Sequence, residues 1–211
     1  LAEDAEATID RLADDPLLVG LRPMVQDLPD DDFLLDPRLV RALNAMVRRN
    51  LVFDALVLPR HLSRLLVMAD RYPALSIVID HGAKPLVRQG LLDPWRADMA
   101  ALAARPNVAC KLSGLVTEAS RSWTIGDLAP SVDHLIGCFG AERLIWGSDW
   151  PVVDCAGGYD AWWAAAEDLT ASLGVQDRGA IFGGNAARIY LAGRGRSTFQ
   201  SDGGGARAEG F

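Results

Sequence analysis

The stretch Leu144-Ile145-Trp146-Gly147-Ser148-Asp149-Trp150-Pro151-Val152 decides the fold of this chain. Its three leading residues are bulky and apolar, and they predict a short buried strand. Gly147 lets the backbone turn tightly or approach a neighbour, and Pro151 ends any further strand ladder. Asp149 then lies just after a strand, where α/β folds place their reactive side chains. The alternative role for an aspartate in this place is to cap the next helix.

Apolar runs of the same kind recur upstream, roughly every 24 to 36 residues, and each is followed by a segment with helical spacing of its apolar residues. The predicted strands are residues 17–21, 51–58, 75–80, 108–112 and 144–146. The predicted helices are residues 2–14, 37–50, 61–72, 97–104, 129–139, 159–172, 175–182 and 185–191. This alternation indicates consecutive βαβ units, which fit a barrel and a doubly wound sheet equally well.

The polar residues that follow the strands favour the barrel. Arg22, His81, Ser113 and Asp149 each come at or just after a strand end, and a (β/α)8 barrel gathers such residues on one catalytic face. No glycine-rich phosphate-binding motif follows any strand, which disfavours a nucleotide-binding sheet. Five strands are visible where a barrel has eight, so we expect about three βα units to be absent on the N-terminal side.

The composition narrows the class of protein further. The formal charge of −7 and the pI near 4.9, without a basic stripe, argue against a nucleic-acid partner. No apolar run reaches the length of a membrane span, and no signal peptide is visible. The three cysteines lack CxxC spacing, which favours a reducing, cytoplasmic setting. The chain begins at Leu1 rather than Met, which is compatible with a missing natural N-terminus.

The alternation of side chains along a strand predicts which residues share the barrel mouth. In residues 75–80 it places Ile77 and Ile79 on the same face as His81, with Asp80 on the other face. The same parity turns Lys111 and Asp149 toward His81. Lysine is costly inside a covered strand unless it is paired. Lys111 is therefore expected either to polarise a substrate oxygen or to form a structural ion pair, with Asp54 as a partner.

The remaining candidates also carry two interpretations each. His81 can bind a divalent metal or move a proton, or it can be a hydrogen-bonded core histidine. The forked donors of Arg22 suit a carboxylate or a lactone carbonyl, and a structural salt bridge suits them as well. Trp95 and Trp150 can stack on a sugar ring, or they can simply pack.

Several segments together resemble the amidohydrolase-2 family, in particular its branch of L-fuconolactonase-like sugar-lactone hydrolases. The segments are Val78-Ile79-Asp80-His81-Gly82-Ala83-Lys84-Pro85, Asn107-Val108-Ala109-Cys110-Lys111-Leu112-Ser113-Gly114, Arg143-Leu144-Ile145-Trp146-Gly147-Ser148-Asp149-Trp150-Pro151, and Asn185-Ala186 with Tyr190. The resemblance extends over about residues 19–191. It implies a distorted (β/α)8 barrel of which the fourth to eighth strands are present.

The resemblance also implies roles for two residues. Asp149 matches the family's general base on the hydrolytic water, which also contacts a metal in some members, and His81 matches a ligand of metal or substrate. The family's HxH pair after the first strand has no counterpart here, so the need for a divalent metal, with zinc as the first candidate, stays open.

We therefore predict a hydrolase that opens a sugar lactone or a similar small cyclic ester in carbohydrate metabolism, with no organic cofactor. The barrel portion is assigned to residues 1–192, and residues 193–211, rich in Gly, Arg and Ser, are predicted to be disordered. Two rivals remain: a metal-dependent decarboxylase of the same superfamily, and a truncated barrel without catalytic activity. The sequence leaves the activity of this chain alone and its oligomeric state open, a homo-oligomer included.

Overall fold

The computed structural model describes residues 4–192, so the predicted disordered tail at 193–211 lies outside the described residues. Five strands form one parallel sheet in the order β1-β2-β3-β4-β5. They are β1 (Gly20–Leu21), β2 (Val52–Ala55), β3 (Ile77–Ile79), β4 (Val108–Leu112) and β5 (Leu144–Trp146). Each strand lies beside the next one in sequence, as consecutive βαβ units require.

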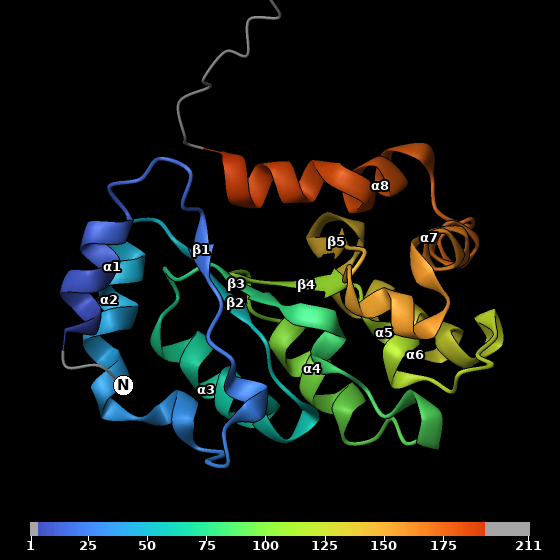
Figure 1. Cartoon of the computed structure of the whole chain (residues 1–211), viewed down its shortest axis with the longest axis horizontal. Coiled ribbons are helices and arrows are strands. Elements are labelled where there is room, and N and C mark those ends of the chain that lie inside the picture. Colours follow the sequence, from blue (N-terminus) through green and yellow to red (C-terminus); the bar gives the residue numbers. More distant parts are fainter. Residues whose placement is uncertain (1–3, 193–211) are drawn as a thin grey trace, which may run out of the picture.

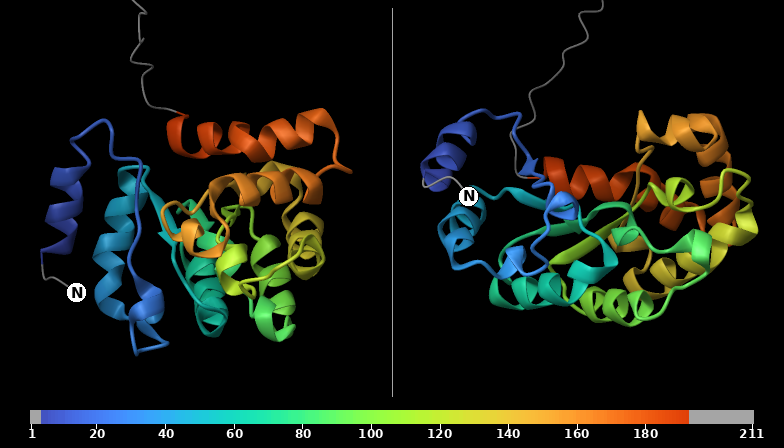
Figure 2. Two further views of the ribbon diagram at one scale, coloured as in Figure 1. Left: turned by 45° about the vertical axis from the view of Figure 1, so that its right-hand side comes forward. Right: turned by 60° about the horizontal axis from the view of Figure 1, so that its bottom comes forward.

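Helices connect the strands, and several of them cover one side of the sheet. They are α1 (Ala5–Leu12), α2 (Val40–Arg48), α3 (Leu62–Arg71), α4 (Trp95–Ala103), α5 (Leu115–Glu118), α6 (Ile125–Phe139), α7 (Gly158–Leu169) and α8 (Val175–Gly179). Figures 1 and 2 show α3, α4 and α6 side by side along one face of the sheet. In the part of the chain that the structure describes, no helix is long and apolar enough to cross a membrane.

The main core lies between the sheet and these helices. Phe53, Ile77, Ile79 and Leu112 point into it from three neighbouring strands. From α3 the core receives Leu62, Leu65, Met68 and Ala69, whose spacing of three and four residues places them on one helical face. These are the residues that hold the sheet against its helical layer.

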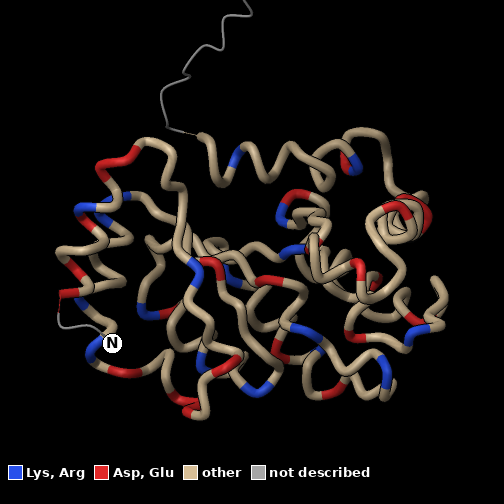
Figure 3. The backbone as a smooth tube through the Cα atoms, viewed as in Figure 1, with Lys and Arg blue, Asp and Glu red and all other residues tan. Residues whose placement is uncertain are grey.

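A second, smaller cluster lies on the opposite face of the sheet. Val52, Val78, Ala109 and Ile145 form it, and residues 180–191, hereafter the C-terminal helical segment, cover it. This segment consists of the π-helical turns Ala180–Gly184 and Ala187–Leu191 joined through Asn185 and Ala186. It runs across the sheet on the side away from α3 and α4 (red in Figures 1 and 2). Arg188 is its one charged residue (Figure 3), in keeping with its apolar packing.

The sheet is open. Among residues 4–192 no pairing joins β1 to β5, and a closed barrel requires a continuous ring of paired strands. The arrangement is the five-unit portion of a (β/α)8 barrel that the sequence predicts.

Several predicted boundaries differ from the structure by a few residues, among them the starts of β1 and α6. Of the predicted strand 17–21, only Gly20–Leu21 pairs with β2. Helix α6 begins at Ile125 rather than at residue 129, because Thr124 and Asp127 form a capping box in which the Thr124 backbone N–H donates to Asp127 Oδ2 at 2.7 Å. Pro130 lies inside this helix and lacks the N–H that would otherwise donate to the Gly126 carbonyl.

Candidate active site

Three polar side chains meet where β3, β4 and β5 end. His81 follows β3, Ser113 follows β4, and Asp149 follows β5. The imidazole Nδ1 of His81 lies 2.8 Å from Ser113 Oγ, and its Nε2 lies 3.5 Å from Asp149 Oδ1. The carboxyl ends of adjacent parallel strands bring these residues together. The structure thus confirms the predicted meeting of His81 and Asp149.

The backbone at this site is held in the left-handed region, which residues other than glycine rarely adopt. The φ angles are +54° at His81, +54° at Gly82, +58° at Ala83 and +54° at Lys84, so the whole turn after β3 is left-handed. Asp149 has a φ of +57°. Each such residue costs of order 1–3 kcal/mol, and such strain gathers at functional sites. The two candidate catalytic residues are therefore both presented by strained backbone.

The His81 ring packs directly against the backbone of Gly114. A Cβ atom added at Gly114 would lie 2.8 Å from both Cγ and Nδ1 of His81, a distance that real side chains essentially never show. Gly114 also has a φ of +62°, so a side chain there is strained in its own backbone as well. The absence of a Cβ at Gly114 thus allows the imidazole to pack against the backbone just after β4.

We expect Gly114→Ala to destabilise the fold by about 1–3 kcal/mol, because it adds both the clash and the left-handed strain. Urea unfolding of the chain measures the change. Gly137→Ala is the matched control: Gly137 lies inside α6, and a Cβ atom added there would meet no atom within 4 Å, so alanine should stabilise by up to about 1 kcal/mol. Equal stability of the two variants would contradict the packing assigned to Gly114.

The environment of His81 keeps its imidazole neutral at pH 7. Burial lowers the pKa of His81 to about 4, because the charged form loses its hydration. Asp149 opposes this effect, and the cations Lys84, Lys111 and Arg22 add to it. A neutral imidazole has one donor and one acceptor nitrogen. Ser113, bound to Nδ1, therefore decides whether Nε2 faces Asp149 as a donor or as an acceptor.

Lys111 lies on the same side of the sheet as this site but is bound to two carboxylates. Its Nζ is 2.7 Å from Asp80 Oδ1 and 3.0 Å from Asp54 Oδ1. Burial alone would lower the pKa of Lys111, but the carboxylates of Asp80 and Asp54 raise it, so the ammonium stays charged. The structure confirms the expected ion pair with Asp54 and adds Asp80. The other expectation for Lys111 is that it polarises a substrate oxygen. That oxygen would have to compete with both carboxylates for the ammonium.

The predicted parity of β3 is wrong. Ile77 and Ile79 point into the main core, whereas Val78 joins the opposite cluster. Ile79 is level with Cys110, so Asp80 comes level with Lys111 and faces the same way as that lysine. His81 reaches the site through the left-handed turn after the strand, not through strand alternation.

The other predicted substrate-binding residues divide into two groups. Arg22 is half-exposed and its Nη1 lies 3.7 Å from Asp80 Oδ2, and Trp150 is 69% exposed next to Asp149; both remain candidates. Trp95 is only 2% exposed, and its indole N–H donates to the Gly82 carbonyl at 2.7 Å. No face of its ring is available to a sugar, so the stacking role predicted for Trp95 is wrong and it instead supports the turn after β3.

Sequence reasoning placed Ser113 on the predicted catalytic face but gave it no chemical role, and it assigned no role in the site to Gly114 or Tyr190. Ser113 and Gly114 directly follow β4. Their position at a strand end is the sequence feature from which a role in the site could have been predicted. The Tyr190 hydroxyl donates to Asp54 Oδ1, although 136 residues separate them in sequence. No local pattern points to a contact of that range.

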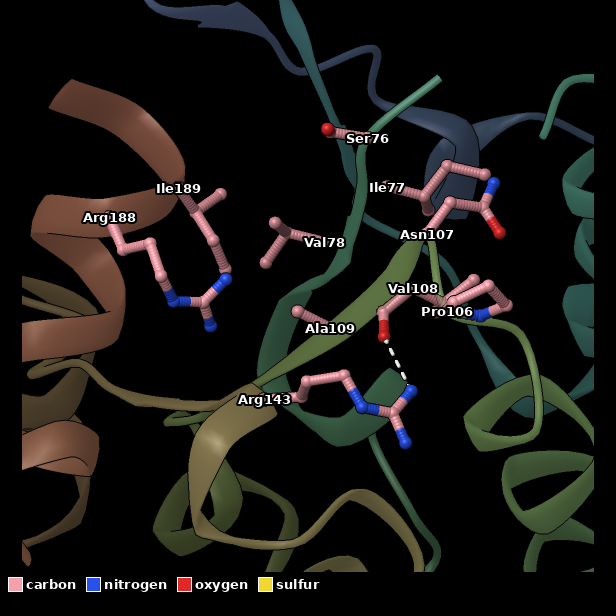
Figure 4. A pocket seen from close by; sticks show the side chains of 10 residues that line it. All are labelled: Ser76, Ile77, Val78, Pro106, Asn107, Val108, Ala109, Arg143, Arg188 and Ile189. Carbon is pink, nitrogen blue, oxygen red and sulfur yellow. Dashed lines mark hydrogen bonds between the residues drawn. The ribbon is translucent and has the colours of Figure 1, made fainter. Parts of the chain in front are cut away.

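A cavity of about 110 Å³ lies at the other end of the strands (Figure 4). Ser76 and Asn107, which precede β3 and β4, line it together with Arg143 and Arg188. Both arginines already donate to backbone carbonyls: Arg143 to Arg105 and Val108, and Arg188 to Glu142. At this end of a barrel, side chains serve stability rather than chemistry.

The described residues do not make a metal site by themselves. No group of three or more His, Cys, Asp or Glu side chains within residues 4–192 is arranged to hold an ion. His81 and Asp149 are the two candidate ligands that lie together, and a catalytic zinc takes three protein ligands.

Comparison with known proteins assigns the chain to a family. A family model described as amidohydrolase matches residues 2–191. The chain is 51% identical over 191 residues to an L-fucono-1,5-lactonase of Burkholderia ambifaria, a match that covers 89% of this chain and 66% of that protein. It is 37% identical over 187 residues to an L-fucono-1,5-lactonase of Burkholderia multivorans, covering 82% and 62%. The chain thus spans just under two thirds of the length of these curated relatives.

The fold is similar to that of a solved amidohydrolase from Burkholderia multivorans, crystallised with bound zinc. The TM-score is 0.78 at 37% sequence identity, over 82% of this chain and 64% of that one. The five strands therefore correspond to part of an amidohydrolase barrel.

Proposed function

The chain belongs to the amidohydrolase family, and from that premise we propose that the whole protein hydrolyses a sugar lactone or a similar small cyclic ester. The observation that carries this proposal is the meeting of His81, Ser113 and Asp149 at the carboxyl ends of three adjacent strands. The two relatives named as L-fucono-1,5-lactonases support the substrate class.

The proposed reaction is attack of water on the lactone carbonyl. Asp149 accepts a proton from water as the water oxygen bonds to the carbonyl carbon. The neutral imidazole of His81, with Ser113 donating to Nδ1, offers Nε2–H to the oxyanion that develops. The ring C–O bond then breaks, and the departing alkoxide takes the proton back from Asp149. The product is the open-chain hydroxy acid.

Arg22 and Trp150 are the proposed substrate-binding residues. Arg22 is half-exposed and its guanidinium makes one long contact to Asp80, 3.7 Å, so donors remain for a lactone or hydroxyl oxygen. Trp150 follows Asp149 directly and offers a largely exposed ring to a sugar face.

We propose that the whole protein binds a divalent metal, with zinc as the first candidate. The solved relative with bound zinc supports it, and His81 and Asp149 are the ligands that this chain would contribute. A bound divalent ion would supply Lewis acidity at the carbonyl oxygen in place of the Nε2–H of His81, because a ring nitrogen that binds a metal carries no proton. We further propose that residues 1–192 form the barrel portion and that the protein acts in the cytoplasm, in carbohydrate metabolism.

The test is an assay of the whole protein with L-fucono-1,5-lactone, with and without a chelator. We expect acid release at least about a hundredfold above the rate in buffer. Decarboxylation of an aromatic acid without lactone opening would contradict the proposal, and so would the absence of both activities. If the lactone is opened without the chelator but not in its presence, the result would support a requirement for a bound metal.

A further inference from the structure

Four polar side chains form a largely buried cluster beside the candidate site: Asp54, Asp80, Lys111 and Tyr190. Lys111 bridges Asp54 and Asp80 at 3.0 Å and 2.7 Å. The Tyr190 hydroxyl donates to Asp54, and the ammonium of Lys111 lies 5.6 Å from the centre of the Tyr190 ring. The four residues come from β2, the end of β3, β4 and the C-terminal helical segment. The cluster therefore connects elements that are distant in the sequence.

One end of this cluster is joined to His81 by a peptide bond. Asp80 is the last residue before the left-handed turn, and its side chain is fully buried. Within residues 4–192 the groups that reach its carboxylate oxygens are the Lys111 ammonium and the Arg22 guanidinium, so these two cations balance its charge. A buried charge held in this way resists movement, because separation from Lys111 would leave it unpaired in a low dielectric. Lys111 thus fixes the point from which the turn to His81 starts.

The other end of the cluster is fixed by the C-terminal helical segment. Ile189 lies over Val78 and Ala109 on the inner face of the sheet (Figure 4). The side-chain amide of Asn185 donates to the carbonyls of Ala141 and Leu144, at 2.7 Å each, which anchors the segment beside β5. Tyr190 is thereby held over Asp54 by packing on one side and by hydrogen bonds on the other.

We propose that Tyr190 and Lys111 are positioning residues for His81, so that the C-terminal helical segment sets the orientation of the imidazole through Asp54 and Asp80. The consequence for turnover rests on the proposed lactone hydrolysis. The orientation itself does not, because it is a property of the folded chain.

Tyr190→Phe tests the proposal because it removes one hydroxyl and keeps the ring. The first measurement is the ring nitrogen and ring proton NMR shifts of the three histidines in the full 211-residue chain, each assigned by its own His→Gln variant. We expect the His81 signals to move and those of His61 and His134 to stay. Tyr159→Phe is the matched control: Tyr159 is an exposed tyrosine that contacts Trp146 and Trp163 through its ring, and its variant should move no His81 signal.

The second measurement is steady-state kinetics of the whole protein. Tyr190→Phe should lower kcat about tenfold and leave KM within about twofold, because misplacing a catalytic group costs rate rather than binding. Asp54→Asn, which preserves volume, should give the same pattern if Tyr190→Phe folds poorly. Unmoved His81 signals in both variants would overturn the proposal. If the proposed lactone hydrolysis is wrong, the unmodified protein will show no turnover. The NMR measurement then still decides whether Tyr190 and Lys111 position His81.

Discussion

Asp149→Asn is expected to lower lactone turnover by the whole protein at least about a hundredfold while the fold stays intact. The amide cannot accept the proton that the attacking water must lose. The fold is preserved for two reasons. Asparagine has nearly the same shape and tolerates the left-handed backbone that Asp149 adopts, with φ of +57°. Within residues 4–192 the Asp149 carboxylate is paired only with His81, whose Nε2 lies 3.5 Å away, so little stabilising interaction is lost.

The matched control for this variant is Asp154→Asn. Asp154 is an exposed carboxylate in the turn that follows, five positions further along the chain, and turnover should stay near that of the unmodified protein. Circular dichroism and urea unfolding of both variants establish that folding is unchanged. Near-normal turnover in Asp149→Asn would remove this residue from the chemistry and, with it, the proposed mechanism.

Lys111→Met should destabilise the chain by about 3–5 kcal/mol, the largest effect on stability that we expect from a single polar residue. Methionine keeps most of the volume of the lysine stem but leaves two carboxylates close together without their shared cation. Asp80 is fully buried and Asp54 is largely so. Burial raises the pKa of Asp54, and Lys111 is the strongest of the groups that oppose this rise. Urea unfolding at pH 7 measures the loss.

Arg38→Met is the comparison that shows whether the loss of stability in Lys111→Met comes from burial of the charges or from the loss of any ion pair. Arg38 and Asp36 form a closer pair, 2.6 Å, but the arginine is largely exposed, and water screens such pairs so that they contribute little to stability. The double variant Lys111→Met/Asp80→Asn should recover part of the stability lost in Lys111→Met, because it removes one of the orphaned charges. If Lys111→Met lowers the free energy of unfolding no more than Arg38→Met does, the cluster around Lys111 contributes little to the stability of the fold.

The order of the elements could be predicted from the sequence because it depends on local patterns. Residues 108–112 and 144–146 form the strands that their sequence predicts, since both are short apolar runs bounded by turn residues. The orientation of β3 could not be predicted. All three of its residues are buried, so the strand lacks the apolar–polar alternation from which one face is distinguished from the other.

The site itself could be predicted in part. His81 and Asp149 are recognisable because each follows a strand, which is a position and therefore visible in sequence. The burial of Trp95 could not be found in this way, because a tryptophan that packs and one that stacks on a ligand look alike in a sequence. The contacts of Asp80 and Tyr190 were also hidden, since one depends on strand register and the other on a helix that returns to the sheet from the far end of the chain.

The two unpaired edges of the sheet bear on self-association of the chain. An exposed edge strand is a template onto which another chain can add a strand, and natural proteins limit this by keeping edge strands very short. Here β1 consists of Gly20–Leu21 and β5 of Leu144–Trp146. Each edge therefore offers only a short row of backbone donors and acceptors, too few to hold a foreign strand firmly. In a whole (β/α)8 barrel the same two edges would instead pair with the remaining strands, so their shortness matters for this five-strand portion on its own.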